Sequence, residues 1–126
     1  MPPLTLSLLP EPYAICRLPP DSALPDWAAV GLFLSITRTV DELSITCRQI
    51  SVPADVQHEG GWRILKLEGP FDLALTGILA PIATALAQAK LNIFALSTYD
   101  TDYVLVKEAK LAEAIKAIEG LGHKVQ

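Results

Sequence analysis

The sequence predicts an α+β fold, in which short strands fill the first half and strands alternate with helices in the second. Two patterns lead to this prediction. "WRILKLEG" (62–69) alternates apolar and charged residues, as in a strand with one buried face, whereas "TGILAPIATALAQAK" (76–90) repeats its apolar residues at helical spacing. With 51% hydrophobic and 19% charged residues, the chain has enough apolar side chains to fill a core. Its 126 residues suffice for one compact domain or two very small ones that share a core.

The first sixty residues are rich in short strands and lack long helices. The predicted strands are "LTLSLL" (4–9), "YAICRL" (13–18), "GLFLSIT" (31–37) and "LSITCRQI" (43–50). Proline-containing segments separate them, as is typical of turns and connectors. Thr39 to Glu42 fit a capping-box pattern, which predicts a single helical turn there. Gly60-Gly61 marks a plausible internal boundary.

The second half has a clearer pattern. Helical spacing predicts one helix over roughly 78–90, with Pro81 tolerated because it lies near the first turn, where its missing N–H costs nothing. Two strands, "NIFALST" and "DYVLVKE", surround a polar turn. A second helix follows over 109–122, with Gly120 and Gly122 as candidate C-caps, and "HKVQ" can add a last strand. Its predicted inward side chains are Leu111, Ile115, Ile118 and Leu121. The order β-α-β-β-α-β is ferredoxin-like and predicts an antiparallel sheet with both helices on one face.

A short internal similarity relates the two halves. "LSITRTVDELSI" (34–45) and "LSTYDTDYVLV" (96–106) both run from a strand through Leu-Ser, threonine and a turn with two acids into a second strand. The similarity has two explanations, duplication of one unit or convergence of two β-hairpins. Under the first explanation, the serine and threonine ends of the two hairpins could meet near a shared interface.

Several functional classes lack their signature in this sequence. Neither His58 nor His123 has a cysteine or acid at metal-ligand spacing, and no nucleotide-binding loop or nucleophile elbow is present, so we expect no metal, no cofactor and no enzymatic activity. The formal charge of −4 and the absence of a Lys/Arg cluster argue against nucleic acid. No apolar run has the length of a membrane span or the flanks of a signal peptide, so we expect no membrane partner and a cytoplasmic location. Cys16 and Cys47 lie in apolar runs, which favours buried thiols over a disulfide or a catalytic thiol.

A small group of residues could bind a polar ligand. Gly77 lies where a helix begins, and the unpaired N–H groups and positive dipole of a helix start suit a carboxylate. Asp72, on the preceding segment, could accept from an ammonium group. Ser97 and Thr98 could offer hydroxyls and Asp102 a carboxylate to the same ligand. The structural alternatives are a turn residue for Gly77, a solvated acid for Asp72 and local backbone bonding for the hydroxyls.

The segment "GILAPIATALAQAKLNIFALSTYDTDYVLVKE" (77–108) resembles an ACT domain, a small amino-acid-binding module of metabolic regulation. The residues that carry the resemblance are Gly77, Ile78, Leu79, Leu86, Asn92 and Ile93. Together with "FLSITRTVDELSITC" (33–47), the segment resembles small bacterial tandem-ACT proteins. These are related to the regulatory part of aspartate kinases and to the cytosolic arginine sensor of animals. The resemblance is specific over 62–126 and weaker over 1–60.

The resemblance implies two ACT-like repeats side by side, with a degenerate repeat over 1–60 and an ACT domain over 61–126. It also implies an amino acid held between the repeats, and a homodimer or docking to a metabolic enzyme. By position, the implied ligand residues are Asp72, Gly77, Ile78 and Leu79, then Ser97, Thr98 and Asp102, and finally Ser35, Ile36 and Thr37. The leading hypothesis is therefore a non-catalytic, amino-acid-binding regulatory module. The alternative is an interaction protein that dimerises or docks on an enzyme without a ligand.

Overall fold

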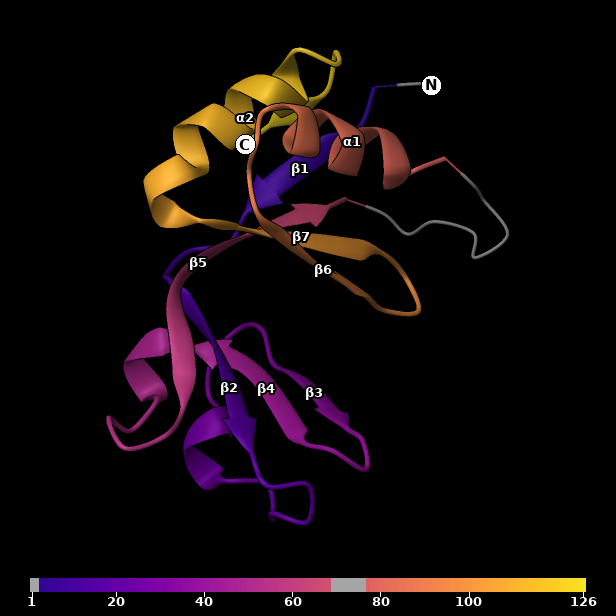
Figure 1. Ribbon diagram of the computed structural model, residues 1–126. Coiled ribbons are helices and arrows are strands. Elements are labelled where there is room, and N and C mark those ends of the chain that lie inside the picture. Colours follow the sequence, from indigo (N-terminus) through magenta and orange to yellow (C-terminus); the bar gives the residue numbers. More distant parts are fainter. Residues whose placement is uncertain (1–2, 69–76) are drawn as a thin grey trace. The chain divides into compact units, whose positions relative to one another are not determined.

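The computed structural model describes residues 3–68 and 77–126. The chain divides into two compact units (Figure 1). We call residues 1–10 and 63–126 the helical unit, and residues 11–62 the strand unit. Strand β1 (Thr5–Leu8) belongs to the helical unit because its pairing partners lie there, whereas the sequence-based division at residue 60 placed it with the first half.

The helical unit contains a mixed sheet in the order β6-β7-β5-β1-β8. β1 runs antiparallel to β5 (His58–Leu67), and it runs parallel to β8 (Lys124–Val125). β6 (Ile93–Ser97) and β7 (Asp102–Lys107) form an antiparallel hairpin, and β7 also pairs with β5. The prediction of a purely antiparallel sheet was therefore wrong. β1 occupies the position beside β5, so the last strand joins β1 instead and runs parallel to it.

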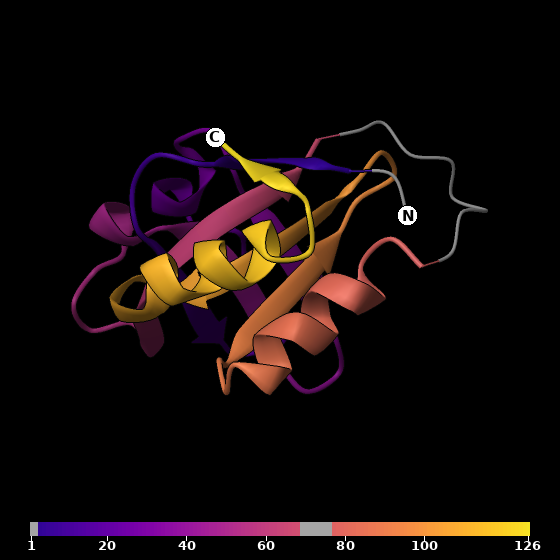
Figure 2. The same cartoon turned by 90° about the horizontal axis from the view of Figure 1, so that it is seen from above.

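Helices α1 (Ala80–Gln88) and α2 (Leu111–Glu119) pack against each other on one face of this sheet, as predicted (Figures 1 and 2). Pro81 lies in the first turn of α1, and a short 3-10 helix (Glu108–Lys110) leads into α2. The core between helices and sheet consists of apolar side chains from every layer. Its buried members are Leu6, Leu65, Leu67, Ile82, Leu86, Leu91, Val104, Val106, Ala114 and Ile118. Each large aliphatic side chain buried here stabilises the fold by about 1.5–3 kcal/mol.

Leu121 was predicted to face the core, but its side chain is 44% exposed. The reason is that α2 ends at Glu119, so residue 121 no longer follows the helical period. Gly122 then adopts φ +94°, a left-handed conformation that suits the glycine after a helix end.

The strand unit is an antiparallel sheet in the order β3-β4-β2-β5. Its strands are β2 (Tyr13–Leu18), β3 (Ser35–Arg38), β4 (Leu43–Arg48) and the beginning of β5. Within residues 11–62, all of which are described, the helices are two short 3-10 turns, Asp26–Ala29 and Gln49–Ser51. This agrees with the predicted lack of long helices. The small core is built from Ala14, Cys16, Ala28, Leu43, Ile45 and Cys47.

The segment from Thr39 to Glu42 forms a hairpin turn and not the predicted helical turn. Thr39 Oγ1 accepts from the backbone N–H groups of Asp41 (3.1 Å) and Glu42 (3.2 Å), and Thr39 N donates to the Glu42 carbonyl (2.9 Å). A threonine can satisfy the same N–H groups in a helix cap or in a tight turn. Here strand β3 precedes the motif and β4 follows it, so strand pairing decides the outcome.

Candidate ligand-binding site

The beginning of α1 is the first part of the predicted site. Gly77 is exposed with φ +74°, and Ile78 and Leu79 are half-buried against the core of the helical unit. Leu79 is the N-cap residue, and its carbonyl accepts from Ala83 N at 3.0 Å. Pro81 has no N–H, so the first turn offers one donor fewer to an anion than an ordinary helix start. Gly77 is thus the predicted residue whose backbone is open to a ligand here, while Asp72 lies outside the described residues.

The β6–β7 hairpin is the second part. Ser97 lies opposite Asp102, and its Oγ donates to Asp102 Oδ1 at 2.5 Å, a charge-assisted hydrogen bond. Thr98 Oγ1 donates to the Thr101 carbonyl (3.1 Å) and accepts from Thr101 N (3.3 Å). Ser97 and Thr98 are exposed, Asp102 is half-buried, and Tyr99 at the tip is 81% exposed. Thr98 therefore makes the local backbone bonds that were the structural alternative, whereas Ser97 bonds the Asp102 side chain, which was not predicted. A ligand would have to replace or extend these bonds.

Strand β3 is the third part. Ser35 lies opposite Thr46 and Thr37 lies opposite Ser44, so the four hydroxyls share one face of the strand unit. Ile36 lies opposite Ile45 and points to the other face, because side chains alternate along a strand. The β3 residues implied by the resemblance thus divide between two faces, and only Ser35 and Thr37 can contact the same ligand.

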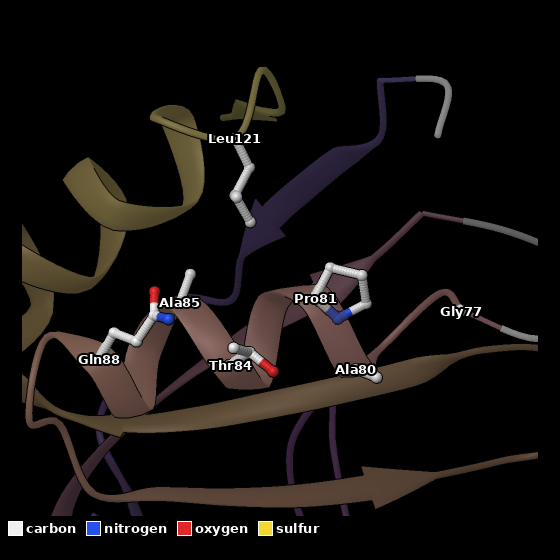
Figure 3. A pocket seen from close by; sticks show the side chains of 7 residues that line it. All are labelled: Gly77, Ala80, Pro81, Thr84, Ala85, Gln88 and Leu121. Carbon is white, nitrogen blue, oxygen red and sulfur yellow. The ribbon is translucent and has the colours of Figure 1, made fainter.

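A hollow of about 450 Å³ runs along α1 (Figure 3). Its lining residues are Gly77, Ala80, Pro81, Thr84, Ala85, Gln88 and Leu121. Leu121 points from the turn after α2 toward α1 (Figure 3). Gly77 is the residue that this hollow shares with the predicted site. Ala80 and Thr84 are small residues at helical spacing, a sequence pattern that indicates a shallow groove but that was not among the predictions.

A second hollow, of about 280 Å³, lies in the strand unit. We call it the Arg17 hollow. Its lining residues are Ile15, Cys16, Arg17, Glu42, Ser44, Gln57, His58 and Glu59. They come from β2, from β4 with the turn before it, and from the beginning of β5. None of these residues was predicted to bind a ligand, because segments distant in the sequence meet here only through strand pairing.

The two cysteines are free and buried, as predicted. Cys16 lies opposite Ile45 and Cys47 opposite Ala14, so the thiols are diagonal neighbours on the core face of the strand unit. A hydrogen bond with Cys47 raises the pKa of Cys16, and burial raises it further. The same hydrogen bond lowers the pKa of Cys47. Cys16 is 1% exposed and Cys47 is 0% exposed, and thiols buried in this way are typical of core packing and not of catalysis.

The histidines have structural partners. Buried His123 accepts from Leu4 N at its Nδ1 (3.0 Å), and His58 Nδ1 lies 2.7 Å from the Val56 carbonyl. The described residues hold no group of three or more His, Cys, Asp or Glu side chains that could bind a metal ion. Across residues 3–68 and 77–126, no helix has the length and apolarity required to span a membrane.

Comparison with known proteins identifies the fold. A family model described as an ACT domain matches residues 57–120, and a second, described as an N-terminal domain, matches residues 11–55. An Agobacterium tumefaciens protein of known crystal structure is 38% identical, with a TM-score of 0.94 over 100% of this chain and 94% of that one. No curated protein matches significantly.

More distant structures share the fold alone. A Vibrio cholerae protein of unknown function, described as a possible transport protein, is 19% identical with a TM-score of 0.75, over 93% of this chain and 88% of that one. The ligand-free regulatory subunit of aspartate kinase from Thermus thermophilus is 15% identical with a TM-score of 0.59, over 91% and 95%. The similarity to aspartate kinase thus concerns its regulatory part, which confirms the α+β fold of ACT type expected from the sequence.

Proposed function

Because the chain belongs to the ACT domain family, we propose that it is a non-catalytic regulatory module that binds an amino acid. The observation that carries this proposal is the family match over 57–120, together with the fold shared with an aspartate kinase regulatory subunit. ACT domains are typically small-ligand modules. The exposed left-handed backbone of Gly77 at the start of α1 supports the proposal, because a residue without a side chain leaves the backbone open to a carboxylate.

In this proposal Asp102 accepts from the ligand's ammonium group. Oδ1 of Asp102 accepts from Ser97 Oγ, and the second carboxylate oxygen, Oδ2, can accept from the ammonium group. Loss of a charged hydrogen-bond partner costs about 1.5–3 kcal/mol, which corresponds to roughly tenfold or more in affinity. Asp102→Asn should therefore weaken binding by about that factor, whereas Asp100→Asn, an exposed position in the same turn, should leave it unchanged.

The test begins with protein that has been unfolded, dialysed and refolded, so that no ligand is carried over. A thermal-shift screen of the twenty amino acids follows, with calorimetric titration of each hit. A ligand at 100 times its dissociation constant adds about 2.7 kcal/mol of stability. Separate Ser35→Ala and Thr37→Ala variants test the β3 hydroxyls. If none of the twenty amino acids stabilises the refolded protein, the proposed function is wrong.

A second candidate function is an interaction protein that dimerises or docks on a metabolic enzyme. Its supporting observation is a set of exposed apolar side chains within residues 24–40 of the strand unit. The set comprises Leu24, Val30, Leu32, Leu34, Ile36 and Val40, with Val40 92% exposed. These side chains lie close together in the sequence, and contiguous exposed apolar patches are typical of contact surfaces. Light scattering after size exclusion should then show a dimer that Leu32→Ser weakens and Ile50→Ser, an exposed apolar control outside the set, does not.

A further inference from the structure

The Arg17 hollow combines opposite charges within one small concave surface. Its volume of about 280 Å³ lies just below the range for small-molecule sites, so it suits a small metabolite better than a nucleotide. Arg17 contributes one cation, and Glu42 and Glu59 contribute two carboxylates. The hollow differs from an ordinary solvated strand face, because residues of both positive and negative charge, from three segments of the chain, line the same concave surface.

Strand register fixes where the charged groups lie. Arg17 lies directly opposite Ser44 on β4, and its backbone N donates to the Gln57 carbonyl at 2.9 Å. Ile15 lies opposite Glu59 on β5. Arg17 therefore lies between the strand that carries Ser44 and the segment that carries Glu59, so a ligand at the guanidinium is within reach of polar groups on both sides.

Local hydrogen bonds hold both sides of the hollow in place. Arg17 Nη2 donates to the Asp41 carbonyl at 2.9 Å. The turn that carries Asp41 and Glu42 is itself fixed by Thr39 Oγ1, which accepts from the N–H groups of both residues. A guanidinium has five N–H donors in a planar fork, so one bond to Asp41 leaves Arg17 able to bind a carboxylate as well.

We propose that the Arg17 hollow binds an α-amino acid, with its carboxylate on Arg17 and its ammonium group on Glu42 and Glu59. The Ser44 hydroxyl completes the polar lining. One cation against two carboxylates gives the lining side chains a formal charge of −1, with His58 neutral, so the hollow prefers a cationic side chain to an anionic one. This inference takes its ligand class from the proposed function, but it assigns a separate site, whose lining residues do not include the predicted ones. Of the predicted residues, Ser35 and Thr37 lie on the same face of the strand unit as Ser44.

The experiment is a titration of the ¹⁵N-labelled full-length protein, followed by amide chemical shifts. The probes are L-lysine, L-glutamate and cadaverine, which is lysine without its carboxylate. At concentrations up to about 10 mM, lysine should shift amides of residues 15–17, 42–44 and 57–59, and glutamate should bind more weakly. Arg17→Gln should weaken lysine binding about tenfold and should not weaken cadaverine binding, whereas Glu42→Gln should weaken both.

The matched control is Arg38→Gln. Arg38 is also an exposed arginine of the strand unit, but its guanidinium donates to the carbonyls of Pro20 and Ser22, which do not line the hollow. Lysine binding should survive this change. Amide shifts confined to residues 77–79 and 97–102 would overturn the inference and leave the proposed function standing. Equal lysine affinity of the wild type and a folded Arg17→Gln variant would overturn it as well. If neither lysine nor glutamate shifts any amide, this inference fails, and the thermal-shift screen of the twenty amino acids decides the proposed function.

Discussion

The hydroxyl of Thr101 offers a sharp test of how the β6–β7 hairpin is joined to the rest of the helical unit. Thr101 is 6% exposed, and its Oγ1 donates to the carbonyl of buried Leu67. Glu68 N donates to the Thr5 carbonyl at 2.8 Å, so Leu6 and Leu67 form a non-hydrogen-bonded pair. The Leu67 carbonyl consequently points away from β1, and Thr101 satisfies it from the other side.

Thr101→Val removes this donor and preserves the branched shape of the side chain. The backbone bonds of the turn, including Thr98 N to the Thr101 carbonyl at 2.8 Å, are unaffected. A buried carbonyl left without its partner costs about 1–3 kcal/mol, and we expect that loss in the free energy of unfolding. Urea titration followed by circular dichroism measures it.

The control is Thr101→Ser, which keeps the hydroxyl and loses one methyl group, at a cost of about 1 kcal/mol. The valine variant should therefore be the less stable of the two. A valine variant within about 0.5 kcal/mol of the wild type would show that the Thr101 hydroxyl does not stabilise the junction with β5.

Two further predictions concern the cores. Ile118 is fully buried on α2, and Ile118→Ala should lower the unfolding free energy by about 2–5 kcal/mol in urea titration. The control Lys116→Ala, at an exposed position, should change it by less than about 0.5 kcal/mol. Equal effects of the two changes would contradict the assigned core. The second prediction concerns alkaline pH. The raised pKa of Cys16 keeps its thiol protonated in the native state, while the unfolded thiol ionises near pH 9. Above that pH the native state binds more protons than the unfolded state. The free energy of unfolding therefore falls as the pH rises further, by up to about 1.4 kcal/mol per pH unit. The lowered pKa of Cys47 acts in the opposite direction and does so below pH 9. Denaturant titrations at pH 8 to 10.5 should show a steeper alkaline loss for the wild type than for a Cys16→Ala/Cys47→Ala variant, and parallel curves would refute the assignment.

Local periodicity was sufficient to predict the helices and most strands. The spacing of Ile82 and Leu86 predicted α1, and alternation around Leu65 and Leu67 predicted β5, because burial on one face imposes these periods directly. The pairing of β1 was not predictable in this way. "LTLSLL" has the same apolar pattern whichever partner it joins, and the partner is chosen by contacts distant in sequence.

The candidate site was predicted less completely. The position of Gly77 just before α1 could be predicted, because glycine readily adopts the positive φ found there, whereas its role in binding stays a prediction. Local backbone bonding was predicted as the alternative for both hydroxyls, and Thr98 follows it. The bond of Ser97 to Asp102 was not predicted, because it depends on the cross-strand pairing of these two residues. The Arg17 hollow could not be found from sequence, because Arg17 and His58 become neighbours only through the register of β2 with β5.

The pairing of β1 has a consequence for biosynthesis. Leu8 pairs with Leu65, 57 residues later, and Leu6 pairs with Val125. At a synthesis rate of about 5–20 residues per second, β1 waits roughly 3–11 s for β5 and about twice that for β8. The strand unit, residues 11–62, emerges completely within this interval and can form its own sheet first. The sequence of the strand unit is thus inserted into that of the helical unit, and it can fold before β5 and β8 reach β1. A fragment started at residue 61 would lack the strand that joins β5 to β8.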